Sequence, residues 1–178
     1  MAVRKASCYS KITAVPYTRK SKKQKLSYVR TVPHMKLTKF RMGDLKGYRD
    51  ERYKTILTIR AKESIQLRDG ALEATRQYLN RFLTEDIGKE FYLEIRPYPH
   101  HIVRENRMLT GAGADRMSSG MARSFGKALN RSALIKAESI LFIIGVNGKK
   151  NEEKVRELIK AVKPRLPCKI RVDTEYKE

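Results

Sequence analysis

The amino-acid sequence predicts an α+β fold: a single compact domain with a mixed or antiparallel sheet and two main helices, plus a basic extended N-terminal arm and a glycine-rich loop. Apolar residues recur at every second position in some segments and at every third or fourth position in others, which separates strands from helices. The chain has 178 residues, enough for one domain with a core, and its 40% hydrophobic content argues against a wholly disordered basic chain. We assign residues 1–50 to the arm and residues 51–178 to the core domain, with the glycine-rich loop at residues 104–118.

The arm is defined by its charge. Lysine and arginine number 40 against 19 aspartates and glutamates, a net charge of +21, and no carboxylate occurs before Asp44. Self-repulsion of this size is relieved when an anionic partner neutralises it. Tyr9, Tyr17, Tyr28 and Phe40 lie among the cations and offer flat faces on which unpaired bases can stack. We therefore expect a nucleic-acid partner, contacted by Arg4, Lys5, Tyr17, Arg19, Lys20, Lys22, Lys23, Lys25 and Arg30.

A solvated tail and a membrane surface are the alternatives for this charge run, and charge runs are often solvated tails. Membrane binding is disfavoured because no amphipathic helix with a bulky apolar face is visible and no apolar run approaches the roughly 20 residues that span a bilayer. The N-terminus lacks the apolar stretch of a signal peptide. Cys8 and Cys168 form no C-x-x-C pair, so we expect reduced thiols in a cytoplasmic protein.

Two elements open the core domain. Residues 53–60 are β-branched and apolar, as in a buried strand. Residues 69–83 follow with a helical pattern, for which Asp69 is the expected N-cap, and Gly88 ends the connection to the next element. The expected apolar face of this helix consists of Ala71, Ala74, Tyr78, Leu79, Phe82 and Leu83.

The next segment, residues 91–96, alternates in polarity and predicts a half-buried strand. Pro97 and Pro99 interrupt it, because proline cannot donate to a central ladder. Residues 102–106 then resume extended structure. The alternation places Phe91, Leu93 and Ile95 on one side and Tyr92, Glu94 and Arg96 on the other.

The C-terminal third has three clear elements. Residues 138–146 predict a buried strand, and a turn follows. Asn151 is the expected cap of a helix that runs to about Lys163, where prolines stop it. Residues 168–173 alternate as a final half-exposed strand. The apolar stripe of the helix consists of Val155, Leu158, Ile159 and Val162.

Residues 107–127 are glycine-rich and resemble a nucleotide site at first sight. A Walker loop has four residues between its glycines, whereas five separate Gly120 from Gly126, and Ala128 stands where the metal-binding hydroxyl is required. The dinucleotide fingerprint requires a third glycine where Arg116 stands. We therefore expect no nucleotide and no other cofactor.

A short helix after Asp115 explains this stretch better, because Met117, Met121 and Phe125 recur every four residues and can pack on the body. Its other face mixes small residues with cations, which lets a phosphate backbone approach closely. Gly126 suits the end of the helix, where a left-handed backbone is needed. The expected RNA-facing residues are Arg116, Ser119, Gly120, Arg123 and Lys127.

Catalysis and metal binding are the other functions to consider. Ser118 and Ser119 lie near Asp115, but no histidine is near them in sequence. His100 and His101 have no nearby cysteine or third ligand, and neighbouring side chains in a strand point to opposite faces. We expect these histidines to contact RNA, and we expect neither enzymatic activity nor a bound metal.

Motifs along most of the chain carry a family resemblance. They are RPYPHH at 96–101, VREN at 103–106, GAGADRM at 111–117 and SFGK at 124–127, with further matches at 8–10, 16–21 and 64–83. The sequence resembles the universal large-subunit ribosomal protein family that joins archaeal and eukaryotic L-ten-e to bacterial L-sixteen, and the archaeal branch is the nearest. In one departure, ALNRSALIKAES at 128–139 replaces a segment that usually contains proline and glycine and ends in ARV, so the family's local turn and its RNA contacts are not carried over.

The resemblance implies a partner and a place. Members of this family bind large-subunit rRNA below the central protuberance, beside the aminoacyl-tRNA corridor and neighbouring ribosomal proteins, and join the subunit late in assembly. They are not catalytic, and we expect no homo-oligomer; a free RNA-binding assembly or translation factor is the alternative. Arg96, Arg104 and Arg107 are the expected RNA contacts near the root of the loop. The loop residues expected to reach towards the tRNA site are Met108, Leu109, Thr110, Gly111, Ala112, Gly113 and Ala114.

Overall fold

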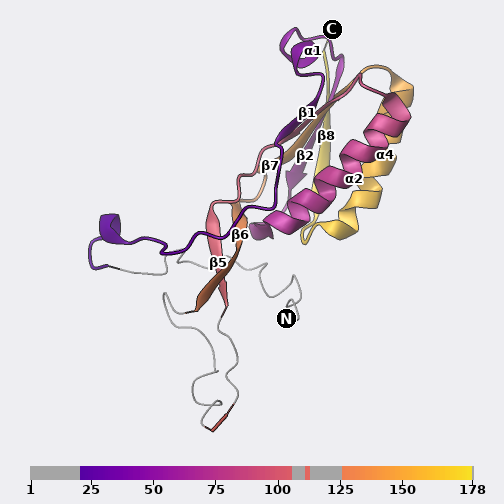
Figure 1. Ribbon diagram of the computed structural model, residues 1–178. Coiled ribbons are helices and arrows are strands. Elements are labelled where there is room, and N and C mark those ends of the chain that lie inside the picture. The colour runs from indigo at the N-terminus through magenta and orange to yellow at the C-terminus, as the bar shows by residue number, and fades with distance from the viewer. Residues whose placement is uncertain (1–20, 106–110, 113–125, 178) are drawn as a thin grey trace.

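A five-stranded antiparallel sheet with two long helices on one face forms the body of the protein (Figure 1). The structure is a computed structural model that describes residues 21–105, 111–112 and 126–177. In spatial order the sheet consists of β1 (Arg41–Gly43), β4 (Tyr92–Ile95), β7 (Ile140–Val146), β2 (Thr55–Ala61) and β8 (Ile170–Tyr176). The buried strand expected at 53–60, that at 138–146 and the half-exposed strand at 168–173 are thus confirmed, with ends shifted by a few residues.

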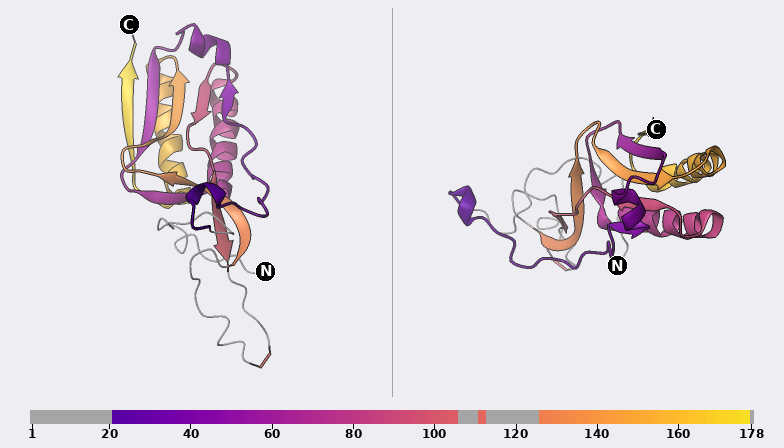
Figure 2. Two further views of the ribbon diagram at one scale, coloured as in Figure 1. Left: turned by 90° about the vertical axis from the view of Figure 1, so that its left-hand side faces the viewer. Right: turned by 90° about the horizontal axis from the view of Figure 1, so that it is seen from above.

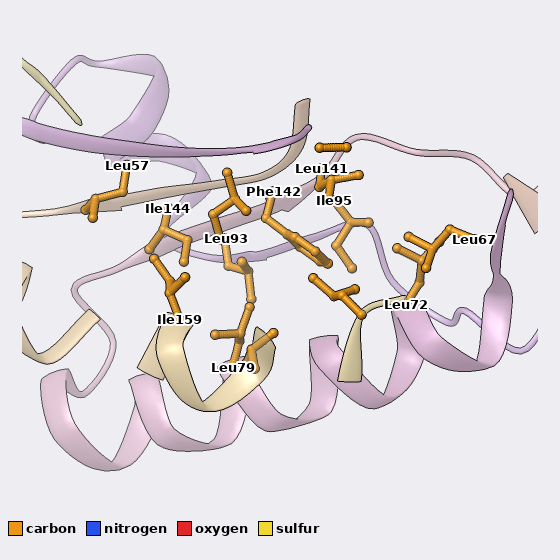
Figure 3. Close-up of a cluster of buried hydrophobic side chains, with 14 of the residues drawn as sticks. Leu57, Leu67, Leu72, Leu79, Leu93, Ile95, Leu141, Phe142, Ile144 and Ile159 are labelled. Atoms are coloured by element: carbon orange, nitrogen blue, oxygen red, sulfur yellow. The ribbon is translucent and has the colours of Figure 1, made fainter. Parts of the chain in front are cut away.

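The helices α2 (Asp69–Ile87) and α4 (Lys149–Val162) lie side by side on the same face of this sheet (Figure 2). The apolar stripe of each helix faces the strands, because residues three and four apart share a helix face. The resulting core is fully enclosed (Figure 3), and it includes Leu57, Leu72, Leu79, Leu93, Phe142, Ile144 and Ile159. No helix within the described ranges is long and apolar enough to cross a membrane.

A second, three-stranded antiparallel sheet extends from the end of the body where α2 begins (Figure 1). Its order is β3 (Ile65–Arg68), β6 (Lys127–Ile135) and β5 (His101–Glu105). The Gln66 side chain on β3 donates to the Ser132 hydroxyl on β6 over 2.8 Å, and both residues are buried. β3 leads directly into α2, so this sheet is fixed to the body.

The face of the main sheet that the long helices leave uncovered has a smaller apolar cluster. The short helix α1 (Leu45–Arg49) begins at Asp44, whose carboxylate accepts from the Gly47 N–H over 2.9 Å. Tyr48 on α1 stacks on Tyr92 with ring centres 3.8 Å apart and planes 9° from parallel. β4 is consequently buried on both faces, so the half-buried strand expected at 91–96 is wrong on this point: Tyr92 and Glu94 are as enclosed as Leu93.

The predicted N-caps of the two long helices are both wrong. Arg68 is the N-cap of α2, and Asp69 is already helical, with its carboxylate turned to the Lys36 and Gly70 N–H groups. α4 begins at Lys149 after Gly148, and the Asn151 side chain donates to the Asn147 carbonyl instead of capping the helix.

The buried stripe of α2 is also rotated relative to the one expected. Leu72 and Thr75 are buried with Leu79 and Leu83, whereas Ala74 is exposed. The apolar stripe of α4 is confirmed: Val155, Ile159 and Val162 are buried, and Leu158 is partly buried.

Strand β6 was not expected. Lys127 is its first residue and does not lie on a helix face, which corrects the prediction for this side chain. Gly126 does have the left-handed backbone, with φ at 97°. The predicted helix from Asp115 lies outside the described residues up to Phe125.

We expect Ile159→Ala to lower the free energy of unfolding by about 2–5 kcal/mol, because the side chain fills enclosed space between α4 and the sheet. Glu157→Ala, on the exposed side of the same helix, is the control and should change stability by less than ~0.5 kcal/mol. Denaturant unfolding of the free protein measures both. Equal effects would contradict the assigned packing face.

Candidate nucleic-acid interface

Residues 21–43 of the arm, the described part of its acid-free run, form a cationic segment without a single carboxylate. The short 3-10 helix η2 (Gln24–Leu26) lies in it, and large apolar side chains remain uncovered: Leu26 is 62% exposed and Val32 54% exposed. Exposed apolar groups among cations suit a partner that has both phosphates and flat bases. The exposed cations are Lys22, Lys23, Lys25, Arg30, Lys36, Lys39 and Arg41.

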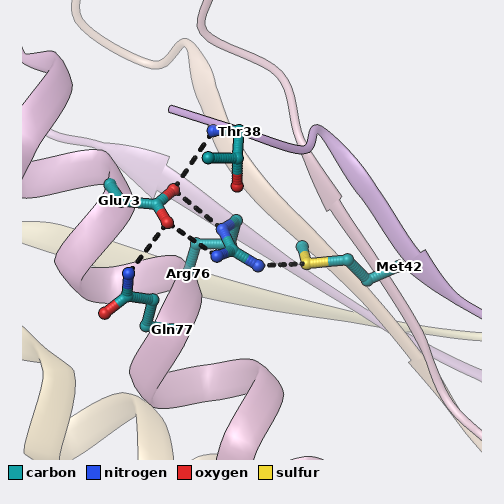
Figure 4. Close-up of polar contacts among 5 residues, drawn as sticks. All are labelled: Thr38, Met42, Glu73, Arg76 and Gln77. Atoms are coloured by element: carbon teal, nitrogen blue, oxygen red, sulfur yellow. Dashed lines mark hydrogen bonds and ion pairs between the residues drawn. The ribbon is translucent and has the colours of Figure 1, made fainter. Parts of the chain in front are cut away.

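Carboxylates on α2 hold the arm to the body (Figure 4). The Lys36 N–H donates to Asp69 Oδ2 over 3.1 Å, and the Thr38 N–H donates to Glu73 Oε2 over 3.4 Å. Arg76 forms a fork with Glu73, at 2.8 Å from Nε to Oε2 and 2.6 Å from Nη2 to Oε1. Leu37 lies between the two anchored residues, Lys36 and Thr38, and its side chain is buried. The arm therefore joins the body in one defined direction at this point.

The charge of Glu73 is stabilised where it lies. The hydrogen bond from Arg76 lowers the pKa of the Glu73 carboxyl below its usual value, burial opposes this, and bonds from Gln77 and Thr38 lower the pKa further. The same fork raises the pKa of the Arg76 guanidinium. The Glu73–Arg76 pair is therefore ionised at neutral pH, and Glu73 remains a charged acceptor for the Thr38 N–H of the arm.

Further contacts carry the arm past the second sheet. Arg131 on β6 donates from Nε to the Pro33 carbonyl over 2.7 Å. Phe40 stacks on Tyr98 with ring centres 5.5 Å apart, and its carbonyl accepts from the Ile95 N–H over 2.8 Å. The arm thus runs beside β6 and then beside β4.

Strands β5 and β6 form the root of the glycine-rich loop. Glu105 is paired in register with Lys127, and the register shifts between Val103 and Arg104. Within the loop, the structure describes the ends of these strands and residues 111 and 112. Both of these residues are exposed, and Gly111 has a φ of 126°. The part of the arm around Pro33 therefore lies beside the strands that form the loop root (Figure 1).

The predicted contact residues fall into three groups. Lys22, Lys23, Lys25, Arg30, Arg96, His100, Lys127, Gly111 and Ala112 are exposed. His101 and Arg104 are buried, at 2% and 6% exposure. Outside the described residues lie Arg4, Lys5, Tyr17, Arg19, Lys20, Arg107, Met108, Leu109, Thr110, Gly113, Ala114, Arg116, Ser119, Gly120 and Arg123, whose assignment stays a prediction.

The two buried members of this set have perturbed charges. Burial lowers the pKa of His101, and the neighbouring His100 and Arg104 lower it further, so the imidazole is neutral near pH 7. Burial also lowers the pKa of the Arg104 guanidinium. His100 is exposed, and its Nδ1 lies 3.0 Å from the Tyr98 carbonyl.

Three cations near this end were not singled out from the sequence. Lys36 and Lys39 are exposed on the anchored part of the arm, and Arg41 is exposed at the start of β1. All three belong to the acid-free run before Asp44, which predicts a cationic arm. Their positions depend on the anchoring to α2 and β4, which no local pattern reveals.

The described residues show no arrangement suited to metal chemistry, since no group of three or more histidine, cysteine or acidic side chains is close enough to hold a metal ion among them. Cys168 is buried as expected of a core residue, and burial together with Glu63 raises the pKa of its thiol to about 11. That thiol is protonated and unreactive at neutral pH.

A stable α+β body with an anchored cationic arm is typical of a protein that binds a polyanion. Comparison with known proteins gives the family. Residues 14–173 match the model of the family described as ribosomal protein L16p/L10e, and the chain belongs to this family.

Curated relatives resemble the chain over nearly its full length, and each of the following is named large ribosomal subunit protein uL16. The one from Staphylothermus marinus is 35% identical, over 97% of this chain and 93% of its own. The one from Methanocella arvoryzae is 39% identical, over 98% and 96%. The one from Thermoplasma volcanium is 40% identical, over 100% and 96%.

Replacing Glu73 with glutamine should lower the free energy of unfolding at pH 7 by about 1–3 kcal/mol, because Arg76 and the Thr38 N–H lose a charged partner. The folded pKa of Glu73 lies below its unfolded value, so this stabilisation is present above the unfolded pKa and is lost as pH falls through the folded pKa. The wild type and Glu73→Gln should therefore converge in stability at acidic pH, as followed by denaturant unfolding.

The matched control is Glu85→Gln on the same helix. Glu85 pairs with Arg81 at 2.9 Å, but both side chains are more than half exposed, so its effect should stay below ~0.5 kcal/mol at every pH. A constant difference between wild type and Glu73→Gln across the acid range would show that the charge of Glu73 is not what anchors the arm.

Proposed function

We propose that this protein is a structural constituent of the large ribosomal subunit and holds large-subunit rRNA with its arm and loop. The observation that carries the proposal is the acid-free arm, fixed by Asp69 and Glu73 beside the root of the glycine-rich loop. Family membership and the names of the relatives support it. On this proposal the protein works in the ribosome, in the cytoplasm, beside other large-subunit proteins, and has no enzymatic role.

We further propose a position for it: below the central protuberance and beside the aminoacyl-tRNA site, where the protein helps to shape the tRNA-binding and peptidyl-transferase region. The direction of β5 and β6, away from the body, supports a loop that reaches into a neighbouring site (Figure 1). The protein would join the subunit late, as a single copy.

The contacts divide by chemistry. Lysines and arginines of the arm would neutralise phosphates, as would Arg96, Arg107, Arg116, Arg123 and Lys127 near the loop. Tyr17 would stack on a base, and His100 and Ser119 would donate or accept hydrogen bonds. The loop, residues 108–114, would lie closest to tRNA. His101 and Arg104 are buried, so they would shape the root of the loop. They would contact RNA only through the small part of each residue that is exposed.

Gradient sedimentation after a high-salt wash tests the role. A constituent of the subunit should remain with the large subunit in about one copy per particle, because many phosphate contacts are made together. A free assembly or translation factor, the alternative function, would be released by the wash, since charge contacts weaken steeply with salt. Release of this protein while other large-subunit proteins stay bound would favour the factor.

Deletion of residues 110–113 tests the loop. Residues 111 and 112, the described part of the deleted segment, are exposed, so the thermal midpoint of the free protein should be nearly unchanged. In cells that depend on the variant, translation or maturation of the large subunit should be impaired. Normal growth and normal subunit profiles would exclude a role of the loop at the tRNA site.

A further inference from the structure

A pocket on the face of the main sheet that the long helices leave uncovered is lined by three arginines and one buried carboxylate. Its lining includes Arg41, Tyr48, Arg49, Tyr92, Glu94 and Arg96. Figure 2, left, looks onto this face, with the long helices behind the strands. The pairing of β1 with β4 places Arg41 opposite Glu94, and Arg49, the last residue of α1, also lines the pocket.

Glu94 organises the pocket. It is 6% exposed, and its Oε2 accepts from the Tyr92 hydroxyl over 2.9 Å. Its Oε1 accepts from Arg41 Nε over 3.2 Å and lies 3.5 Å from Arg96 Nη1. The side chains of these two arginines are nevertheless 56% and 52% exposed. Since a guanidinium has five N–H donors, each arginine is held by the carboxylate and still presents donors to solvent.

Two aromatic side chains of the pocket lining pack on each other. Tyr92 is enclosed, and the Tyr48 ring stacks on it almost in parallel. Burial and Glu94 raise the pKa of the Tyr92 phenol, so its hydroxyl remains a donor to Glu94. With three arginines and one carboxylate the lining is cationic, and its donors are in place before any ligand arrives.

We propose that this pocket is a preformed receptor for a phosphate of the RNA backbone, with Arg41, Arg49 and Arg96 as ligands and Glu94 as the positioning residue. Planar guanidinium forks match the geometry of phosphate oxygens. RNA is the source that the structure favours over free phosphate, because Arg41 directly continues the arm that Asp69 and Glu73 anchor. The proposal rests on the proposed function and extends the RNA surface from the arm along the β1 edge of the sheet.

The charge of Glu94 provides the decisive test. If the pocket acted through net charge alone, Glu94→Gln would bind RNA more tightly, because it removes a negative charge. If Glu94 positions the arginines, the same variant binds RNA several-fold more weakly, since the arginine side chains must then be ordered when RNA binds. The measurement is the affinity of the full chain for a transcript of archaeal large-subunit rRNA, titrated with salt, alongside thermal unfolding to confirm that the variant is folded.

If Glu94→Gln is unstable, variants of Arg41 test the pocket instead, because the Arg41 side chain is largely exposed. Arg41→Ala should weaken binding and reduce the steepness of the log–log salt slope by about 0.7 to 0.9, the contribution of one phosphate. Arg41→Lys, which retains the charge without the fork, should recover the slope but only part of the affinity.

The controls come from α2, where Arg81 and Glu85 form an exposed pair on the outer face. Arg81→Ala and Glu85→Gln make the same charge changes away from the pocket and should leave affinity almost unchanged. Binding by folded Glu94→Gln as tight as wild type or tighter, or equal effects of Arg41→Ala and Arg81→Ala, would overturn the receptor.

Titration with inorganic phosphate separates the two phosphate sources. No saturable binding is expected at millimolar phosphate; saturable binding that Arg41→Ala abolishes, with RNA affinity unaffected, would make the pocket a small-anion site instead. The wild-type slope tests the proposed function itself and should be steeper than roughly −4. A flat wild-type titration would contradict RNA binding altogether, whereas a steep one with indifferent pocket variants would contradict only the receptor.

Discussion

Charge repulsion is the constraint on which the rest of this structure depends. A chain with a net charge of +21 folds only if its cations are kept apart or held by acids. The buried carboxylates meet this need: Glu73 grips Arg76, Glu94 holds Arg41, and Glu152 accepts from Arg156 over 3.0 Å. Asp69 binds the backbone of the arm instead. The buried carboxylates thus fix the positions of the cations that they bind.

This arrangement divides the surface into two kinds of cation. Arginines of the body, such as Arg76 and Arg156, have carboxylate partners that lie on the same helix. The lysines of the arm before Asp44 have no carboxylate in their own segment, so an external anion is their natural counter-charge. The body can therefore be stable by itself while the arm retains most of its capacity to neutralise RNA.

The sequence predicted those features that depend on local pattern. Apolar, β-branched runs predicted the buried strands at 53–60 and 138–146, which the structure has at 55–61 and 140–146. The period-3.6 segments predicted both long helices, and the acid-free run identified the arm. It failed where a side chain has a distant partner: Asp69 could have capped α2 but instead binds Lys36, 33 residues away. Strand β6 has a mixed pattern and is defined by its pairing with β3 and β5. Likewise, Arg41 and Glu94 are 53 residues apart, so no motif could reveal their pocket.

The order of strands in the main sheet also determines how the chain must acquire its structure during synthesis. Strand β2 of the main sheet pairs only with β7 and β8 among the described strands, and both are made long after it: Ile56 lies opposite Gly145 and Glu175. A ribosome making this protein therefore releases the cationic arm and an unpaired β2 well before the core can close. Non-local pairing of this kind is slow and leaves apolar strands exposed to aggregation. The apolar side chains of β2 thus stay without their sheet partners until the last strand, β8, emerges.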